Sequence, residues 1–237
     1  MVQALLLDLD NTLLGNDMEV FLPAYLASLS KHVSHLFEQE PFIQRLLQAT
    51  DAMMVNTDPA TTNQEAFDAA FFPCLGRTRE ELEPVFEDFY ATRFPELRSV
   101  TELRPESRTL VDWAFEQDLR IAVATNPMFP LTAIEQRLEW AGVPVDRYPY
   151  HLVTSYESMH ATKPHTAYYQ EMARRLGQQP EHCLMVGDEW HMDIQPAQSL
   201  GMQTYWITSP DIPPPVEDES LNGYGSLPDL VEWIKSY

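Results

Sequence analysis

From about Arg104 onward, short apolar segments of strand character alternate with segments whose apolar residues repeat at helical spacing. The predicted strands are RIAVAT, YHLVTS, HCLMVGD and MQTYWIT, and a further one, ALLLDLD, opens the chain. The predicted helices are PESRTLVDWAFEQD, LTAIEQRLEWAG, HTAYYQEMARRLG, MDIQPAQSLG and LPDLVEWIKSY. Strands and helices that alternate in this way form βαβ units around a parallel sheet. We therefore predict an α/β fold with a doubly wound, Rossmann-like parallel sheet of about five core strands.

Residues 16–95 follow a different pattern. Four stretches carry apolar stripes with a helical period: MEVFLPAYLASLSKHVSHLF, EPFIQRLLQATDAMM, NQEAFDAAFFPCLG and TREELEPVFEDFYATRF. Thr78 and Glu81 form a predicted capping box at the start of the last one. We expect a helical domain of residues 16–95, inserted into an α/β core made of residues 1–15 and 96–237.

Composition and charge narrow the range of partners. The chain has 237 residues, of which 44% are hydrophobic, and a formal net charge of −21. Nucleic acids and anionic membranes bind basic patches, so neither is an expected partner. No apolar run reaches the ~18 residues of a membrane span. An anionic substrate would need local positive charge, and lysine occurs only at Lys31, Lys163 and Lys235.

The cysteines and the first residues of the chain indicate the cellular compartment. Cys74 and Cys183 lie far apart in dissimilar contexts and do not form a disulfide framework. The first apolar run has no basic segment before it and is interrupted by aspartates, unlike a signal peptide. We expect a protein of the reducing cytoplasm. No feature of the sequence indicates an oligomeric state.

Polar side chains follow several of the predicted strands. Ligands bind beyond the carboxyl ends of the strands in an open parallel sheet. The first strand delivers Asp8, Asp10 and Thr12 to that edge, and VATNP delivers Thr125 and Asn126. The loop ESMHATKPHT carries Lys163, and GDEWHMDI carries Asp188 and Asp193. We predict that these residues form one site.

The chemistry suited to this set is phosphoryl transfer assisted by a metal. Mg²⁺ prefers oxygen ligands and is bound through one or two carboxylates, which Asp8 and Asp188 can supply. An aspartate can attack phosphorus to form an aspartyl-phosphate, while a second carboxyl group moves the proton. Lys163 can neutralise developing negative charge, and Thr125 with Asn126 can donate hydrogen bonds to phosphoryl oxygens. The expected partner is a small phosphorylated substrate.

Four segments, taken in order, resemble the signatures of the haloacid dehalogenase-like hydrolase superfamily. They are DLDNT, ATN, ATKPHTAYY and VGDEWHMDI, and the helical insertion resembles the C1 cap of that superfamily. The sequence departs mildly from the usual signatures at two places. Asn11 stands where glycine is commoner, and Trp190–His191 lie in the fourth signature.

The resemblance implies a role for each matching residue. Asp8 corresponds to the nucleophile and Asp10 to the general acid/base. Mg²⁺ would be held by Asp8, the backbone carbonyl of Asp10 and Asp188, with Asp193 and Thr12 supporting these groups. Thr125, Asn126 and Lys163 would bind the phosphoryl group. The implied activity is hydrolysis of a phosphate monoester through an aspartyl-phosphate.

Other functions remain open at this point. The same scaffold supports dehalogenases and phosphonatases, and a regulator could keep the site only to bind phosphate and metal. Dehalogenating members lack the second aspartate and need no metal, so Asp10 favours the phosphatase. Pure binding has no need of Asp10 either.

Several weaker patterns have plainer interpretations. DLDNTLLGNDME partly matches a calcium loop, but Leu13 stands where such loops need glycine. His32 and His35 have no third ligand nearby, and we interpret the histidines of the site loops as surface or capping residues: His160, His165 and His191. The stripe of Phe67, Phe71 and Phe72 is interpreted as core of the helical domain. DIPPPVEDES is expected to be a surface loop.

Overall fold

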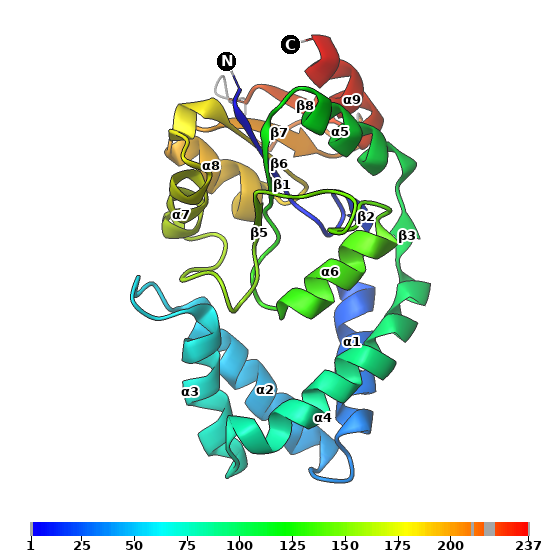
Figure 1. Ribbon diagram of the computed structural model, residues 1–237, viewed down its shortest axis with the longest axis vertical. Coiled ribbons are helices and arrows are strands. Elements are labelled where there is room, and N and C mark those ends of the chain that lie inside the picture. The colour runs from blue at the N-terminus through cyan, green and yellow to red at the C-terminus, as the bar shows by residue number, and fades with distance from the viewer. Residues whose placement is uncertain (1, 210, 216–220, 237) are drawn as a thin grey trace.

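A six-stranded parallel sheet forms the centre of the chain (Figure 1). The computed structural model describes residues 2–209, 211–215 and 221–236. The strand order is β5-β4-β1-β6-β7-β8. The strands are β1 (Ala4–Leu7), β4 (Arg120–Val123), β5 (Leu152–Val153), β6 (Cys183–Gly187), β7 (Gln203–Ile207) and β8 (Gly223–Gly225). The predicted α/β fold is confirmed. The sixth strand, β8, was not predicted, because its sequence Gly-Tyr-Gly has no apolar run.

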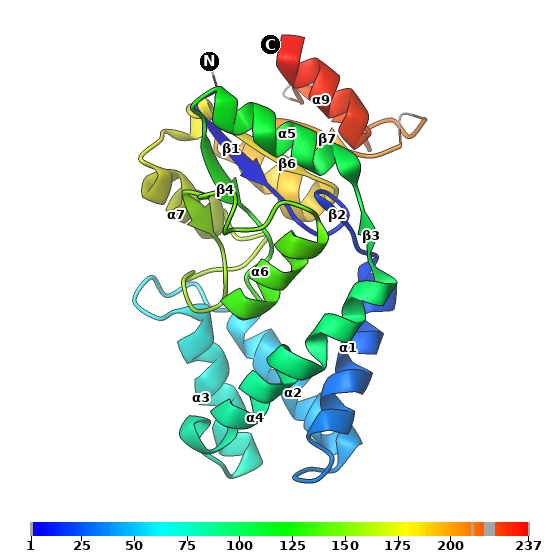
Figure 2. The same ribbon diagram turned by 45° about the vertical axis from the view of Figure 1, so that its right-hand side comes forward.

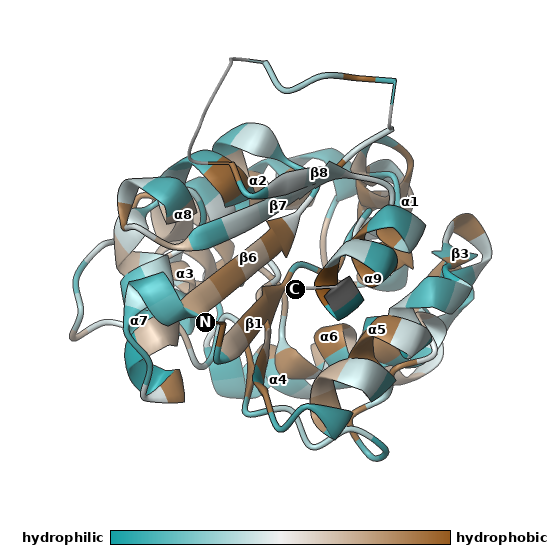
Figure 3. Cartoon of the chain, turned by 90° about the horizontal axis from the view of Figure 1, so that it is seen from above, coloured by the Kyte–Doolittle hydropathy of each residue, from teal (hydrophilic) through white to brown (hydrophobic). Residues whose placement is uncertain are grey.

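Helices cover both faces of the sheet. Leu5 and Leu7 of β1 belong to one buried cluster, together with residues of α5 (Pro105–Glu116), α6 (Leu131–Trp140) and α9 (Leu227–Ser236). Ala4 and Leu6 belong to a second cluster, with residues of α7 (Thr166–Leu176) and α8 (Gln195–Ser199). Successive side chains of a strand point to opposite faces, so β1 packs against both helical layers. Viewed from above, β1 and β6 are hydrophobic ribbons in the middle of the structure (Figure 3).

Four further helices lie together beyond the carboxyl edge of the sheet (Figures 1 and 2). They are α1 (Met18–His32), α2 (Gln39–Met54), α3 (Asn63–Leu75) and α4 (Arg79–Thr92). The capping box of Thr78 and Glu81 is present at the start of α4. Phe71 and Phe72 are buried, and Phe67 is half-buried. The turn η1 (Phe94–Val100) leads from these helices back toward the sheet.

The chain enters and leaves the helical region side by side. β2 (Leu14–Gly15) and β3 (Glu102–Leu103) pair antiparallel, with Gly15 opposite Glu102. A Cβ atom on Gly15 would lie 2.9 Å from the Cβ of Glu102, which is closer than two such atoms can approach. A glycine is therefore required where the two crossings meet. The exact boundaries of the two predicted domains stay a prediction.

A second connection joins the helical region to the sheet at the start of α3. The backbone N–H groups of Asn63 and Gln64 donate to the carbonyl oxygens of Met159 and Tyr156, both at 2.8 Å. The side chain of Asn63, which is fully buried, also donates to the carbonyl of Ala161 at 3.2 Å. The residues 154–165 form the loop between β5 and α7, and we call it the β5–α7 loop.

The predicted helix MDIQPAQSLG is divided in two. A π-helical turn η3 (Trp190–Ile194) precedes the short helix α8. Pro196 lies in the first turn of α8, where it needs no backbone donor. Part of the predicted loop DIPPPVEDES, residues 216–220, lies outside the described residues. Among the helices that the structure describes, none has the length and apolar character needed to cross a membrane.

Candidate active site

Three of the predicted segments meet because β1 lies between β4 and β6. Asp8 follows β1, Thr125 follows β4 and Asp188 follows β6. The ladder continues past the strand ends, since Asp8 donates its N–H to Val186 at 2.9 Å and Ala124 donates to Leu7 at 2.7 Å. The register of the central strands therefore brings the residues of three loops to one edge.

Lys163 binds two of the predicted acids at once. Its Nζ lies 2.6 Å from Oδ1 of Asp8 and 2.5 Å from Oδ1 of Asp193. The three side chains are almost completely buried, with 3%, 6% and 1% of the area of Lys163, Asp8 and Asp193 exposed. A buried lysine needs such partners, because an unpaired ammonium would lose its hydration without compensation. The lysine of the β5–α7 loop is thus fixed against the end of the central strand.

Asp193 reaches this point because residue 187 has no side chain. A Cβ atom on Gly187 would lie 2.3 Å from Cγ of Asp193. The other oxygen of Asp193, Oδ2, accepts the backbone N–H of Glu189 at 3.1 Å. The turn η3 therefore folds Asp193 back over the end of β6. Asp193 is held from two sides, by a backbone amide and by Lys163.

The carboxylates form a cluster with excess negative charge. Oxygen atoms of Asp8, Asp188 and Asp193 all lie within 4.8 Å of one another, and no other such group occurs in the part of the chain that the structure describes. Burial raises the pKa of Asp8 well above its ordinary value, and Lys163 acts against this shift. Burial, with Asp193 nearby, raises the pKa of Asp188 to about 7.

This donor set fits a divalent cation. Once all three carboxylates are ionised, the one ammonium of Lys163 leaves two negative charges in excess. Burial alone would lower the pKa of Lys163, but Asp193 and Asp8 outweigh it and hold that pKa well above the ordinary value. The lysine thus stays charged, and the remaining excess matches the charge of Mg²⁺. All the donors are oxygens, which is the ligand type that Mg²⁺ takes.

Asp10 lies apart from this cluster. Its Oδ2 accepts from Nη1 of Arg137 at 2.6 Å, and its Oδ1 accepts from Nδ2 of Asn16 at 2.6 Å. Arg137 belongs to α6 and is fully buried. Neither Arg137 nor Asn16 was predicted as a site residue. The signal for Arg137 was an arginine within the buried stripe of α6, next to Leu138 and one turn after Ala133 and Ile134.

Thr125 and Asn126, predicted to bind phosphate, are held by the β5–α7 loop and the helix after it. Thr125 is buried, and its carbonyl oxygen accepts from Thr154 and Tyr168, each at 2.8 Å. The Oδ1 atom of Asn126 accepts the backbone N–H of Lys163 at 3.2 Å. Asn126 therefore ties the loop after β4 to the β5–α7 loop.

The first signature makes a tight turn. Asn11 has a φ of 55°, in the left-handed region, where asparagine is the side chain best tolerated after glycine. This conformation explains how Asn11 replaces the commoner glycine. Thr12 is fully buried, and its hydroxyl has no partner among the described residues. Arg104 closes the turn from outside by donating to the carbonyl oxygens of Asn11 and Thr12.

The histidines make contacts away from the carboxylate cluster. Nε2 of His32 lies 3.1 Å from the carbonyl of Val85, and His160 pairs with Glu171 at 3.0 Å. Nε2 of His165 lies 3.0 Å from the carbonyl of Met54, and His191 contacts Gln195. These contacts agree with capping and surface roles.

Comparison with known proteins gives the family. Residues 2–201 match the family of haloacid dehalogenase-like hydrolases. The chain belongs to this family. The predicted resemblance, drawn from the four signatures, is confirmed, and so is the assignment as a hydrolase.

Among curated members of such enzymes, a glyceraldehyde 3-phosphate phosphatase of Methanocaldococcus jannaschii is 34% identical over 76 residues. The match covers 31% of this chain and 33% of that protein, so the chain spans only a third of the relative. Solved structures resemble this chain over nearly its whole length, and two of them illustrate the range. A HAD phosphatase from Thermococcus onnurineus has a TM-score of 0.60, with 19% identity and 99% and 98% of the two chains covered. A 2-haloacid dehalogenase from Pseudomonas syringae has a TM-score of 0.66, with 18% identity and 100% and 99% covered. At these identities the two structures establish the fold.

Proposed function

We propose that this haloacid dehalogenase-like hydrolase is a Mg²⁺-dependent phosphatase of small phosphate monoesters. The observation that carries the proposal is the contact of Lys163 with Asp8 and Asp193 inside a cluster of three carboxylates. It combines a nucleophile, a positive charge for a phosphoryl oxygen and a set of oxygen donors. The relative named as a glyceraldehyde 3-phosphate phosphatase supports the same class of reaction.

The proposed reaction has two steps. A carboxylate oxygen of Asp8 attacks phosphorus, the ester P–O bond breaks, and Asp10 gives a proton to the departing alkoxide. Asp10 then takes a proton from water, whose oxygen attacks the phosphorus of the aspartyl-phosphate. The bond from phosphorus to Asp8 breaks, and inorganic phosphate and the free carboxylate result.

The other residues orient the phosphoryl group and neutralise its negative charge. Lys163 offsets the charge that develops on the phosphoryl oxygens, and Thr125 with Asn126 supplies hydrogen-bond donors beside it. Asp8, Asp188 and the backbone carbonyl of Asp10 would hold Mg²⁺, with Asp193 and Thr12 behind them. When bound, the ion screens the incoming phosphate from the carboxylates.

A dehalogenase on the same scaffold is the rival proposal, since one of the similar structures is a 2-haloacid dehalogenase. A halide leaves as a stable anion and needs no proton, so a dehalogenase needs no general acid at the position of Asp10. Here both oxygens of Asp10 are engaged, by Arg137 and Asn16, which gives that carboxylate a defined place. Asp10 therefore favours the phosphatase over the dehalogenase and over a protein that only binds phosphate.

The test is phosphate release from a panel of monoesters, including p-nitrophenyl phosphate, with Mg²⁺ and with EDTA. We expect release that requires Mg²⁺, is abolished in Asp8→Asn and is severely slowed in Asp10→Asn with Mg²⁺ binding kept. Asp146→Asn, at an exposed position, is the matched control. Near-normal activity of Asp8→Asn would contradict the mechanism. Halide release from a 2-haloacid, with no phosphate release, would establish the rival.

A further inference from the structure

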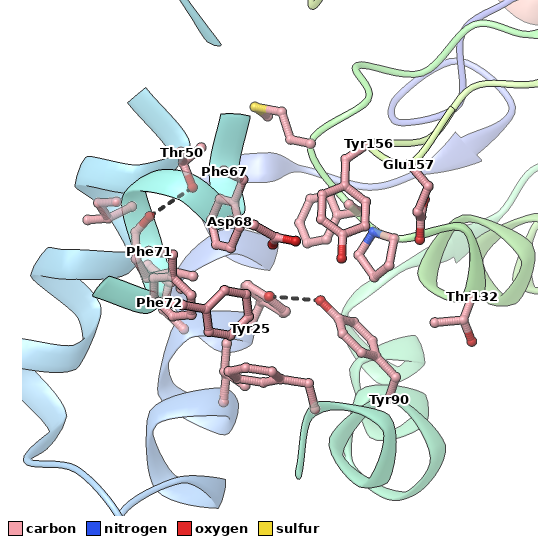
Figure 4. A pocket seen from close by; sticks show the side chains of 18 of the residues that line it. Tyr25, Thr50, Phe67, Asp68, Phe71, Phe72, Tyr90, Thr132, Tyr156 and Glu157 are labelled. Carbon is pink, nitrogen blue, oxygen red and sulfur yellow. Dashed lines mark hydrogen bonds between the residues drawn. The ribbon is translucent and has the colours of Figure 1, made fainter. Parts of the chain in front are cut away.

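A cavity of about 470 Å³ lies between helices α1–α4 and the loops at the carboxyl edge of the sheet (Figure 4). Its volume is in the range of small-molecule sites. Its walls are aromatic and aliphatic, with Tyr25, Phe67, Phe71, Phe72, Tyr90 and Phe129 among the lining side chains. The hydroxyls of Tyr25 and Tyr90 bind each other at 3.0 Å, and this contact uses the O–H group of one of them. The interior therefore offers mainly apolar surface.

The cavity is built on the same loops as the Asp8 site. Met128, Phe129 and Pro130 line it, and they directly follow the Thr125–Asn126 segment. Tyr156 and Glu157 line it from the β5–α7 loop, which carries Lys163.

A direct chain of contacts connects the two places. The ring of Phe129 lies 4.7 Å from the guanidinium carbon of Arg137, and Arg137 binds Asp10. The cavity therefore adjoins the side of Asp10 on which Arg137 lies.

The charged residues of the cavity disfavour anions. Arg79 is the only cation among the described lining residues, and it is bound by Asp68 at 2.5 Å and Glu83 at 3.1 Å. Asp51 and Glu87 add further negative charge to the lining. A second phosphate or a carboxylate would find like charges here and no free positive partner.

Polyhydroxylated groups are disfavoured as well. A hydroxyl placed against the phenylalanine rings loses its hydrogen bonds to water without replacement, and the acceptors that the lining offers are confined to its acidic and hydroxyl side chains. A flat hydrocarbon ring loses nothing of this kind and gains contact with aromatic faces and edges.

We propose that the cavity receives the leaving group of the phosphate ester, and that this group is a bulky, apolar, uncharged alcohol, such as an aryl or arylalkyl alcohol. The inference rests on the proposed phosphatase function and names the substrate class of that same site. Sugar phosphates and bisphosphates are then poor substrates.

The experiment compares phenyl phosphate, 2-naphthyl phosphate, glycerol phosphate and glucose 6-phosphate on the natural protein. The first two release related aromatic alcohols, so the main difference between them is the second ring. We expect a kcat/KM for 2-naphthyl phosphate about tenfold above that for phenyl phosphate. Its ratio to the kcat/KM of the two polyhydroxylated esters should be larger still. Binding of 2-naphthol, followed by its fluorescence, reports on the cavity without any turnover.

A variant that fills the cavity tests whether the preference for 2-naphthyl phosphate arises there. Thr50 lines the cavity from α2, and its hydroxyl donates to the carbonyl of Leu46 one turn before at 3.0 Å (Figure 4). Thr50→Phe would place a ring in the cavity. Val55→Phe is the matched control, because Val55 follows the same helix, is 75% exposed and lies outside the cavity. We expect Thr50→Phe to remove the advantage of 2-naphthyl phosphate and to weaken 2-naphthol binding, with phenyl phosphate changed less than about twofold.

The outcomes separate the two proposals. No phosphate from any ester, with Mg²⁺ bound, overturns the phosphatase and this inference together. Phosphate released from phenyl and glycerol phosphates as fast as from 2-naphthyl phosphate leaves the phosphatase standing and overturns the inference. Equal effects of Thr50→Phe on both aryl esters would also overturn it.

Discussion

Arg137 donates to Asp10 at 2.6 Å, although 127 positions separate the two residues in the chain. The arginine is fully buried, and its Nε and Nη2 atoms have no partner among the described residues. Its guanidinium instead packs near the rings of Phe129 and Phe21. The one strong polar contact of this buried cation is therefore with the predicted acid/base, whose orientation it fixes.

Replacing Arg137 should affect turnover more than folding. In Arg137→Met, Asp10 keeps only Asn16, and we expect kcat to fall by on the order of tenfold to a hundredfold, with a smaller change in KM. Arg137→Lys should recover part of the loss. Arg93→Met, at an exposed ion pair with Glu96, is the control. If kcat stayed normal in a folded Arg137→Met protein, Arg137 would have no positioning role.

The close approach of Gly187 and Asp193 makes a second prediction. Gly187→Ala places a methyl group where Asp193 now lies, and we expect it to lower the free energy of unfolding by roughly 1–3 kcal/mol and to remove activity. Gly76→Ala is the control, because Gly76 has a φ of 62° and open space around it. That change should cost about 1 kcal/mol by strain alone and leave turnover unchanged. Equal activity in the two variants would show that the packing of Asp193 is unimportant.

Binding of Mg²⁺ should depend on pH. Burial raises the pKa of Asp188 to about 7, so in the metal-free protein this carboxyl group is largely protonated at pH 6 and largely ionised at pH 8. The proton must leave before the group can bind a cation, so affinity should fall as pH falls, by about tenfold between pH 8 and pH 6. Calorimetric titrations at the two pH values measure this directly. Equal affinities would contradict the assignment of Asp188 as a ligand.

The two cysteines should react at different rates. Burial raises the pKa of the Cys183 thiol to about 11, and Cys183 is fully buried, whereas Cys74 is exposed. The thiolate is the reactive form, so a disulfide reagent at pH 8 should modify one thiol promptly and the second only after unfolding. Cys74→Ser should then show no prompt reaction. Rapid modification of two thiols in the native protein would be inconsistent with the packing of β6.

The parts of the site that could be predicted from sequence are those placed by strand ends. Asp8, Thr125 and Asp188 each follow an apolar strand, and the parallel sheet brings such positions to one edge. Asp193 was predicted through the fourth signature, although the turn that brings it back over Gly187 was not.

Arg137 could not be found in this way. Helical periodicity distinguishes buried from exposed faces, and a charged residue on a buried face does not indicate which distant residue it will bind. The phenylalanine stripe of α3 shows the same limit. Phe71 and Phe72 are buried, as expected for core, yet they also line the cavity. The space between helices depends on how several of them pack, and the period of one helix carries no information on it.

The hydrogen bonds from Asn63 and Gln64 to the β5–α7 loop have a consequence for engineering. The loop that accepts them also carries Lys163, so the helical region is tied to the segment of this lysine by backbone contacts as well as by its two crossings at Gly15 and Glu102. A chimaera that exchanged residues 16–95 for the helices of another member would keep the bonds to Met159 and Tyr156 only if the new helix placed two backbone N–H groups at the same points, and it would lose the side-chain bond of Asn63 unless an asparagine stood there. A workable exchange would therefore carry residues 154–165 along with the helices, as one transferable unit made of two separate stretches of chain.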